Sequence, residues 1–213
     1  MPGTDAATKP ARATAPASLV LASASPTRAR LLRAAGVPFH VDAPSVDEAE
    51  AKRSLEAEGA DGAAIAEALA ELKARRVARR HPGALVLGAD QILECDGRRF
   101  DKPADRTVAA AQLRALAGRE HELVSAAVVM RDETRLWHAV DRARLRMRPL
   151  GDAAIAAYLD RAGEAALGSV GAYQLEGLGA QLFAAVEGDF FTILGLPLLP
   201  LLDFLRGHGV VPA

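Results

Sequence analysis

The sequence predicts an α/β protein whose mixed, twisted sheet is flanked by helices. Short apolar segments of strand length alternate with segments of helical period along most of the chain, which is typical of this class. An Asp-Gly step at Asp96 lies between two extended segments and predicts a hairpin, which joins antiparallel strands. The sheet is therefore expected to be mixed.

The first part of the chain is expected to begin with a buried strand at 18–22, where the apolar run is continuous. A Ser-Pro step then starts a helix at 27–35, and a glycine ends it. A second strand at 37–41 leads into an acidic loop around Asp47. A long helix is expected at 61–80, because its apolar residues recur on one side and a Pro-Gly step follows it.

The second part continues the alternation. An apolar run at 84–87 precedes a hairpin at 91–100, whose turn is Asp96-Gly97. The remaining elements are, in order, a helix at 104–117, extended runs at 121–130 and 136–147, a helix at 152–159, a Gly-rich loop at 168–179, a strand at 180–186 and a closing helix at 196–205.

Length and composition limit the class of protein. The 213 residues are most simply one domain over 18–207, with a disordered extension at 1–17 and a tail at 208–213. Lys and Arg number 26 against 27 Asp and Glu, and this net charge of -1 argues against a general nucleic-acid binder. Because Cys95 is the single cysteine, an internal disulfide is excluded and a reducing cytoplasm is expected. The apolar runs are too short for a bilayer and no secretory signal is visible, so neither a membrane nor a secreted protein is expected.

The segment between the first strand and the first helix is a candidate anion site. It reads Ser-Ala-Ser-Pro-Thr-Arg from Ser23, and it combines two hydroxyls, the N–H groups of a helix N-terminus and the guanidinium of Arg28. Such a set suits phosphate. The alternative is a helix cap, with Ser25 as N-cap and Pro26 at the first helical position, and the two interpretations are compatible.

Asp90 is a second candidate. It follows an apolar run, which would place it at the carboxyl edge of the sheet, where α/β proteins bind their ligands. A carboxylate there can act as a general base or bind a metal. The alternative is a turn aspartate that accepts hydrogen bonds from backbone N–H groups.

Other polar residues are ambiguous when each is taken alone. Lys102 precedes a proline, Lys73 lies on the flank of the long helix and Glu48 stands in the acidic loop, and each is typical of a solvated surface residue. The Gly-rich segment at 171–177 is more distinctive, because it combines close backbone approach with Tyr, Gln and Glu side chains. Its alternative is a tight crossover.

Several common sites are not expected. The histidines lack the spacing of a zinc site, and Cys95 favours buried packing over a nucleophilic role. Neither a P-loop nor a dinucleotide-binding fingerprint occurs in a suitable context.

Together these segments resemble the Maf-like nucleoside triphosphate pyrophosphatases, once described as septum formation proteins. The similarity covers residues 19–205, and the order and spacing of the motifs are highly specific. The motifs are Leu21-Ala22-Ser23-Ala24-Ser25-Pro26-Thr27-Arg28, Val46-Asp47-Glu48, Lys73-Ala74, Gly88-Ala89-Asp90, Lys102-Pro103, Gly171-Ala172-Tyr173, Glu187-Gly188-Asp189 and Gly195-Leu196-Pro197-Leu198.

The resemblance implies a two-lobed fold around a cleft, akin to the inosine triphosphatases. It implies cleavage between the α- and β-phosphates of a nucleoside triphosphate, which gives a nucleoside monophosphate and pyrophosphate and requires Mg²⁺ or Mn²⁺. No nucleic-acid or membrane partner is implied, and a homodimer is compatible with the family. The implied roles are proton acceptor for Asp90, neutralisation of the triphosphate for Lys73 and Lys102, metal binding for Glu48, and phosphate binding for Ser23, Ser25 and Arg28.

The resemblance also implies that three further positions select the base of the nucleotide. Relatives that act on dTTP and UTP have Arg, Thr and Gln there, whereas those that resemble the 7-methyl-GTP enzyme have Trp, Gln and Glu. This chain has Thr27, Gln91 and Glu176, so two positions follow the second pattern and Thr27 follows neither. The resemblance is therefore closer to the 7-methyl-GTP subfamily, without the stacking surface that a tryptophan would provide.

The leading hypothesis is a metal-dependent pyrophosphatase that acts on 7-methyl-GTP or another modified nucleotide. A dTTP/UTP pyrophosphatase is the alternative within the family. A nucleotide-binding regulator of cell division without catalysis is the alternative of another class. Such a regulator would not need Asp90 and Glu48, and both carboxylates are present.

Overall fold

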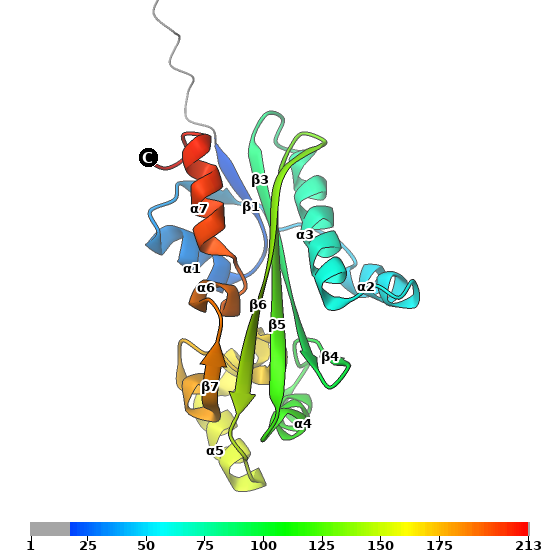
Figure 1. Ribbon diagram of the computed structural model, residues 1–213, viewed down its shortest axis with the longest axis vertical. Coiled ribbons are helices and arrows are strands. Elements are labelled where there is room, and N and C mark those ends of the chain that lie inside the picture. The colour runs from blue at the N-terminus through cyan, green and yellow to red at the C-terminus, as the bar shows by residue number, and fades with distance from the viewer. Residues whose placement is uncertain (1–17, 213) are drawn as a thin grey trace, which may run out of the picture.

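One mixed sheet organises the fold (Figure 1). The structure is a computed structural model that describes residues 18–212, so the extension expected at 1–17 lies outside the described residues. The strands are β1 (Leu19–Ala22), β2 (Phe39–Val41), β3 (Leu85–Cys95), β4 (Arg98–Phe100), β5 (Glu120–Arg131), β6 (Thr134–Met147) and β7 (Phe183–Glu187). Their order is β2-β1-β3-β5-β6-β7, and β4 pairs with β3. β1 is parallel to β2 and β3, and the other pairings are antiparallel, so the prediction of a mixed sheet is confirmed.

Helices cover the sheet and begin where polar side chains can cap them. The helices are α1 (Pro26–Ala34), α2 (Glu48–Ala57), α3 (Gly62–Ala78), α4 (Arg106–Leu116), α5 (Asp152–Ala162), α6 (Phe190–Ile193) and α7 (Leu198–Gly207). Ser25 and Asp61 accept hydrogen bonds from backbone N–H groups at the starts of α1 and α3, and Asp105 does the same for α4. Shorter 3-10 turns occupy the predicted Gly-rich loop.

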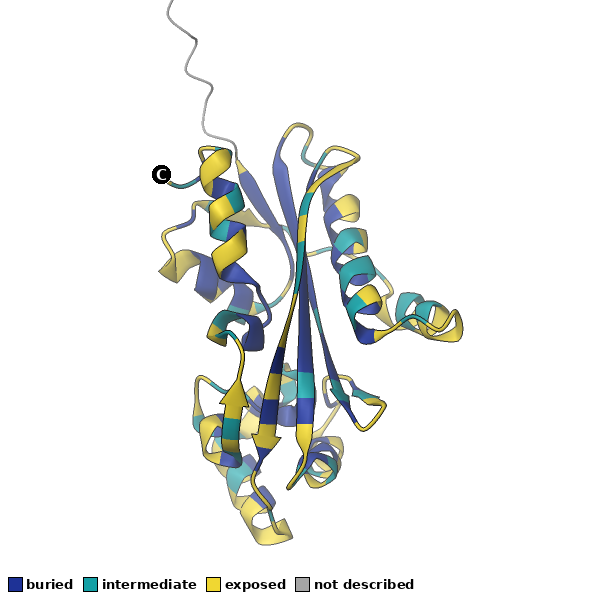
Figure 2. Cartoon of the chain, viewed as in Figure 1, coloured by how far each residue is buried: buried dark blue, intermediate teal, exposed yellow. Residues whose placement is uncertain are grey.

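Both faces of β3 are buried, and successive residues of the strand belong to different cores (Figure 2). Leu85 and Leu87 pack in the core beneath α1 and α7, whereas Val86 and Ile92 pack in the core beneath α3. The near-continuous apolar sequence of β3 follows from this position between two layers of helices.

The long strands β5 and β6 run through two lobes (Figure 1). One lobe holds β1, β2, α1, α3 and α7. The other lobe holds β4, β7, α4 and α5, as Figure 1 shows. The expected two-lobed α/β arrangement is confirmed, and none of the helices in residues 18–212 is long and apolar enough to cross a membrane.

Two expectations about the first half were wrong. The residues expected as a run at 84–87, a break and a separate strand form one strand of 11 residues, because β5 pairs with it continuously from Leu85 to Glu94. Asp90 therefore lies inside a strand rather than after one. Glu48 was expected in an acidic loop but begins α2, a helix that was not predicted, because Asp47 accepts a hydrogen bond from the Glu50 backbone N–H and caps it.

The hairpin prediction is confirmed. Asp96 and Gly97 have φ values of 49° and 76°, the left-handed conformation that a two-residue turn between antiparallel strands requires. The closing helix expected at 196–205 is also present, as α7, and α6 before it was not predicted.

Candidate active site

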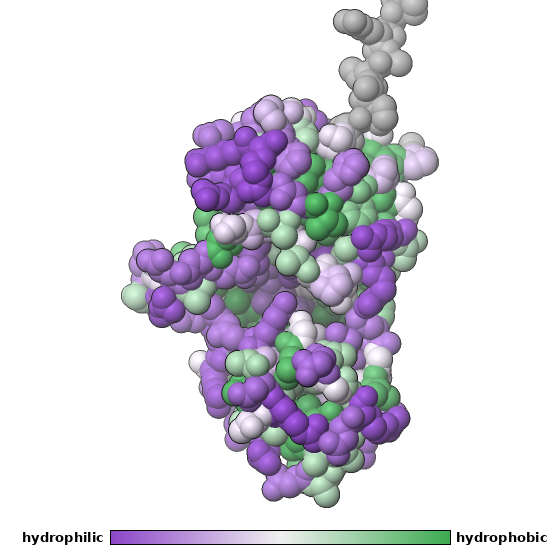
Figure 3. Space-filling model, turned by 180° about the vertical axis from the view of Figure 1, so that it is seen from behind, coloured by the Kyte–Doolittle hydropathy of each residue, from purple (hydrophilic) through white to green (hydrophobic). Residues whose placement is uncertain are grey.

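A gap in one edge of β3 creates the site. β1 pairs with this edge only as far as Gly88, and β4 joins the same edge at Leu93, while β5 occupies the opposite edge. Asp90 and Gln91 lie in the gap between the two partners. A cleft of about 1060 Å³ opens there and appears as the hollow between the lobes in Figure 3.

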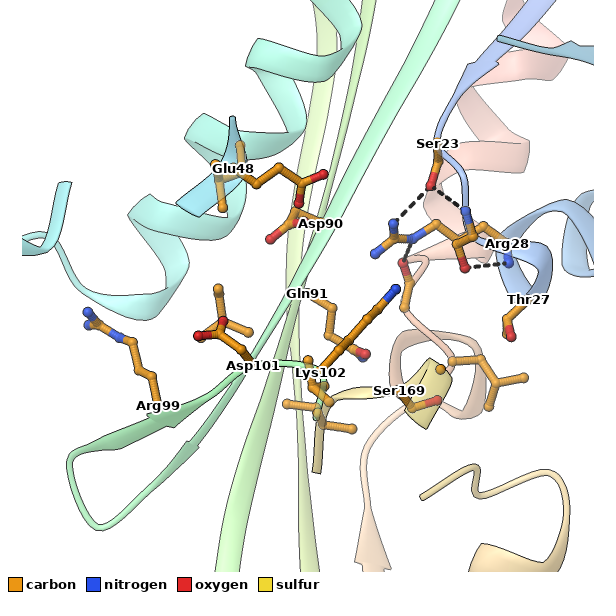
Figure 4. Close-up of a pocket in the computed structure, with 18 of the residues that line it drawn as sticks. Ser23, Thr27, Arg28, Glu48, Asp90, Gln91, Arg99, Asp101, Lys102 and Ser169 are labelled. Atoms are coloured by element: carbon orange, nitrogen blue, oxygen red, sulfur yellow. Dashed lines mark hydrogen bonds between the residues drawn. The ribbon is translucent and has the colours of Figure 1, made fainter. Parts of the chain in front are cut away.

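The Ser-Pro loop forms one wall of the cleft. Ser23 Oγ accepts hydrogen bonds from the Ser25 backbone N–H at 3.2 Å and from Arg28 Nη1 at 3.1 Å (Figure 4). Arg28 Nε donates to the carbonyl oxygen of Gly195 at 2.8 Å. Gly195 has a φ of +93°, and a Cβ there would lie 3.4 Å from Arg28 Nη2, so glycine suits this contact.

Arg28 is buried without a carboxylate partner in the described part of the chain. Its hydrogen bonds go to a hydroxyl and a carbonyl oxygen, and only 8% of the residue is exposed. Burial is the largest influence on the pKa of Arg28 and lowers it. Ser25 caps α1, as the helix-cap interpretation predicted. The Arg28 guanidinium, three residues further on, also lines the cleft, so the cap and the candidate anion site coexist.

Lys73 connects the two acidic residues of the site. Its Nζ lies 2.6 Å from Asp90 Oδ1 and 2.8 Å from Glu48 Oε2. Lys73 and Asp90 are buried, whereas about half of the Glu48 side chain is exposed. The interpretation of Lys73 as a solvated residue was wrong, because α3 packs against β3 so closely that a Cβ at Gly88 would lie 2.0 Å from the Ala70 carbonyl oxygen.

Lys102 approaches from the other lobe. It follows β4, and in Figure 4 its side chain extends across the cleft toward Arg28. Burial lowers the pKa of Lys102, and the positive charges of Arg28 and Lys73 lower it further. Neither Arg28 nor Lys102 forms an ion pair within residues 18–212, so the cleft holds two cations that an anion would stabilise.

The three positions that were expected to select the nucleotide base also line the cleft. Gln91 Nε2 donates to Ser125 Oγ at 3.0 Å and to the carbonyl oxygens of Thr192 and Ile193 at 3.2 and 3.0 Å. Glu176 forms an ion pair with Arg30 of α1, which connects the Gly-rich segment to the opposite wall. Thr27 lies at the start of α1.

All of the candidate site residues identified in the sequence line this one cleft. Their chemical roles remain predictions. The cleft-lining set is Ser23, Ser25, Thr27, Arg28, Glu48, Lys73, Asp90, Gln91, Lys102 and Glu176. Sequence reasoning missed Lys52, which lines the same cleft and pairs with Asp101. Lys52 lies four residues after Glu48, a spacing that places both side chains on one face of a helix. Because that helix was not predicted, the spacing was not recognised.

Comparison with known proteins identifies the family of this chain. A family model described as Maf-like protein matches residues 18–208. The chain belongs to the Maf-like family. It is 60% identical over 190 residues to a nucleoside triphosphate pyrophosphatase of Paramagnetospirillum magneticum, across 89% of this chain and 98% of the relative. It is 51% identical over 195 residues to a 7-methyl-GTP pyrophosphatase of Rhizobium meliloti, across 92% of this chain and 98% of the relative.

A solved structure of a HAM1 protein from Coxiella burnetii is 19% identical to this Maf-like chain. It covers 62% of this chain and 73% of its own, with a TM-score of 0.39.

The Maf-like site has two carboxylates that fit a divalent cation. Glu48 and Asp90 each use one oxygen on Lys73, which leaves a second oxygen on each side chain. Within the described residues no three His, Cys, Asp or Glu side chains gather as a ready-made metal site. This donor set fits Mg²⁺, which proteins commonly hold with one or two carboxylates while water and substrate phosphates complete the shell.

Proposed function

We propose that this Maf-like protein is a nucleoside triphosphate pyrophosphatase. The observation that carries the proposal is the placement of two cations without acidic partners, Arg28 and Lys102, beside the Glu48–Lys73–Asp90 cluster in one cleft. A triphosphate supplies the missing negative charge, and the carboxylates supply a base. Relatives at 60% and 54% identity that carry the name nucleoside triphosphate pyrophosphatase support it.

The reaction assigns a task to each group. Water attacks the α-phosphorus, the bond from that phosphorus to the oxygen bridging to the β-phosphate breaks, and pyrophosphate leaves with a nucleoside monophosphate as the other product. Asp90 accepts a proton from the water, and its Oδ2 is suited to this because Lys73 occupies Oδ1. Arg28 and Lys102 stabilise negative charge on the phosphates.

A divalent cation, Mg²⁺ or Mn²⁺, belongs to the proposal. Glu48 would hold it through the carboxylate oxygen that Lys73 does not contact, and when bound it would supply charge neutralisation to the phosphates. About half of the Glu48 side chain is exposed, so this oxygen is accessible from the cleft. The proposed setting is the cytoplasm, and the proposed assembly is a homodimer.

For the substrate we propose 7-methyl-GTP or another modified nucleotide. The pair Gln91 and Glu176 in the cleft supports it, as does the Rhizobium meliloti relative of that name. A dTTP/UTP preference would leave the reaction intact and change only the base.

The test is pyrophosphate release from 7-methyl-GTP, GTP, UTP and dTTP, with Mg²⁺, Mn²⁺ or chelator, by the wild type and by Asp90→Asn. We expect release only with metal, and a loss of about 10²- to 10⁴-fold in the variant, which stays folded because Lys73 keeps Glu48 as a partner. Near-normal activity of Asp90→Asn would contradict the assignment of Asp90 as the general base. Nucleotides that raise Tm with metal present but are never hydrolysed would favour a binding regulator.

A further inference from the structure

A polar row crosses the middle of the otherwise apolar sheet beside the cleft. Gln91 of β3 is the cross-strand partner of Ser125 on β5, and Ser125 is the partner of Asp141 on β6. Directly opposite residues share one face of a sheet. Thr192 of α6 lies over this face, where its backbone or side chain contacts all three residues.

Thr192 is fixed from three directions. Its Oγ1 donates to Asp141 Oδ2 at 2.7 Å, and its backbone N–H donates to Asp189 Oδ2 at 2.8 Å. Its carbonyl oxygen accepts from Ser125 Oγ at 2.8 Å. Ser125 and Thr192 are fully buried, so these bonds have little competition from water.

This arrangement determines which way the Gln91 amide points. Two backbone carbonyls, which only accept, lie within 3.2 Å of Nε2. The Ser125 hydroxyl donates its hydrogen bond to the Thr192 carbonyl oxygen, so toward Gln91 it can act only as an acceptor. The opposite orientation would place the amide oxygen against three acceptors, and the NH₂ group is therefore held in the wall.

The oxygen Oε1 of Gln91 is left for the cleft. It forms no hydrogen bond within residues 18–212, and it does not belong to the buried unpaired atoms there. It lies 3.7 Å from the position that a Cβ would take at Gly195, which lines the same cleft. Figure 4 shows Gln91 among the residues that line the cleft.

We infer that Ser125 is a positioning residue that holds Gln91 as an acceptor for a donor group of the nucleoside. The inference rests on the proposed function and deepens it. An acceptor repels phosphate oxygens, so Oε1 is suited to an N–H of the base or a hydroxyl of the ribose. The triphosphate is left to Arg28 and Lys102.

The test measures binding rather than turnover. The proteins are the wild type, Ser125→Ala, Gln91→Ala and the double variant, with Ser54→Ala on exposed α2 as a matched control. The ligands are the α,β-methylene analogues of GTP and UTP, the 2′-deoxy form of the tighter one, and inorganic tripolyphosphate, which has no nucleoside.

We expect Ser125→Ala to weaken binding of the tighter nucleotide by about fivefold, without weakening binding of tripolyphosphate. In the Gln91→Ala background the same change should have no further effect, because Ser125 acts through Gln91. A 2′-deoxy analogue that binds Gln91→Ala and the wild type alike would identify the ribose hydroxyl as the donor. A loss on Gln91→Ala that is equal for the ribose and the 2′-deoxy forms would place the donor on the base or on the 3′-hydroxyl.

Two results would overturn the inference. One is an equal loss of tripolyphosphate affinity, because the effect of Ser125→Ala would then not depend on the nucleoside. The other is an effect of Ser125→Ala that persists in the Gln91→Ala background, as a merely structural serine would give. If nucleotides bind as expected but no pyrophosphate is released from any triphosphate, the proposed function fails while the positioning role stands.

Discussion

Asp90 and Gln91 follow one another on β3, and their side chains leave opposite faces of the sheet. Asp90 pairs with Lys73 of α3, whereas Gln91 donates to the Thr192 carbonyl of α6. Both nevertheless line one cleft, because β1 has ended and β4 has not yet begun on that edge of β3. The gap lets a single strand present a carboxylate and an amide to one cleft.

Gly88→Ala should separate α3 from β3. A Cβ at this position would lie 2.0 Å from the Ala70 carbonyl oxygen and 2.8 Å from the Ala74 backbone nitrogen, and backbone atoms cannot move aside as a side chain can. We expect a loss of about 2 kcal/mol in the free energy of unfolding, together with reduced pyrophosphate release, because Lys73 is displaced from Asp90. Urea unfolding measures the first effect. Gly207→Ala is the control, since a Cβ there meets nothing within 4 Å, and equal losses in the two variants would contradict this account.

Lys73→Met should destabilise the protein at neutral pH. The change leaves the buried Asp90 carboxylate without its ion-pair partner, and breaking a buried pair in this way costs about 3 kcal/mol. Lys52→Met is the matched control, because its partner Asp101 is exposed and such pairs contribute at most about 1 kcal/mol. Urea unfolding of both variants at neutral pH measures the difference in their unfolding free energies and so tests this prediction. A cost no larger than that of Lys52→Met would mean that the buried Lys73–Asp90 pair does not stabilise the fold.

The elements that sequence reasoning could predict are those with local signals. Strand β1 is a short apolar run, and α1 begins at a serine cap followed by proline. Helix α2 has no buried residue, so no apolar stripe marks it. Only Ala51 and Leu55 pack, partly buried, against the core beneath α3, and ion pairs with the β4 hairpin, such as Lys52 with Asp101, add to this contact. Partners so far apart in sequence leave no periodicity.

The composition of the site was predictable, but its construction was not. Ser23, Arg28 and Asp90 could be nominated from their motifs, whereas the position of Asp90 depends on where two other strands stop pairing with β3. The role inferred for Ser125 depends on register across β3, β5 and β6. Because these pairings join distant segments, neither composition nor period reveals them.

Lys102 should make triphosphate binding depend on pH. Burial and the charges of Arg28 and Lys73 lower its pKa, so the ammonium loses its proton at a pH below the ordinary lysine value of about 10.4. Bound triphosphate favours the charged form, and KM should therefore rise as pH increases through that lowered pKa. Lys102→Arg should move the rise to higher pH, because a guanidinium stays charged. KM for the best substrate, measured from pH 7 to pH 10, tests this, with Lys52→Arg as control. An identical rise in all three proteins would exclude Lys102 as its cause.

His121 should weaken the fold in acid. It is buried at 3% exposure, its Nε2 lies 2.8 Å from the Tyr173 hydroxyl, and its Nδ1 has no partner within the described residues. Burial lowers the pKa of His121 to about 4, against an ordinary value of about 6.5. Between these values the unfolded chain binds the proton and the folded chain does not. The free energy of unfolding therefore falls as pH decreases from 6.5 toward 4, by about 3 kcal/mol in all.

His121→Gln removes this proton-binding group while keeping a side chain that can hydrogen-bond to Tyr173. We expect its unfolding free energy to fall less steeply than that of the wild type between pH 6.5 and pH 4, as measured by urea unfolding at each pH. His40→Gln, at an exposed position of β2, should keep the wild-type slope. Carboxylates titrate alike in all three proteins, so only the difference between slopes reports on His121. Parallel slopes for the wild type and His121→Gln would mean that His121 takes up its proton in the folded state as readily as in the unfolded chain.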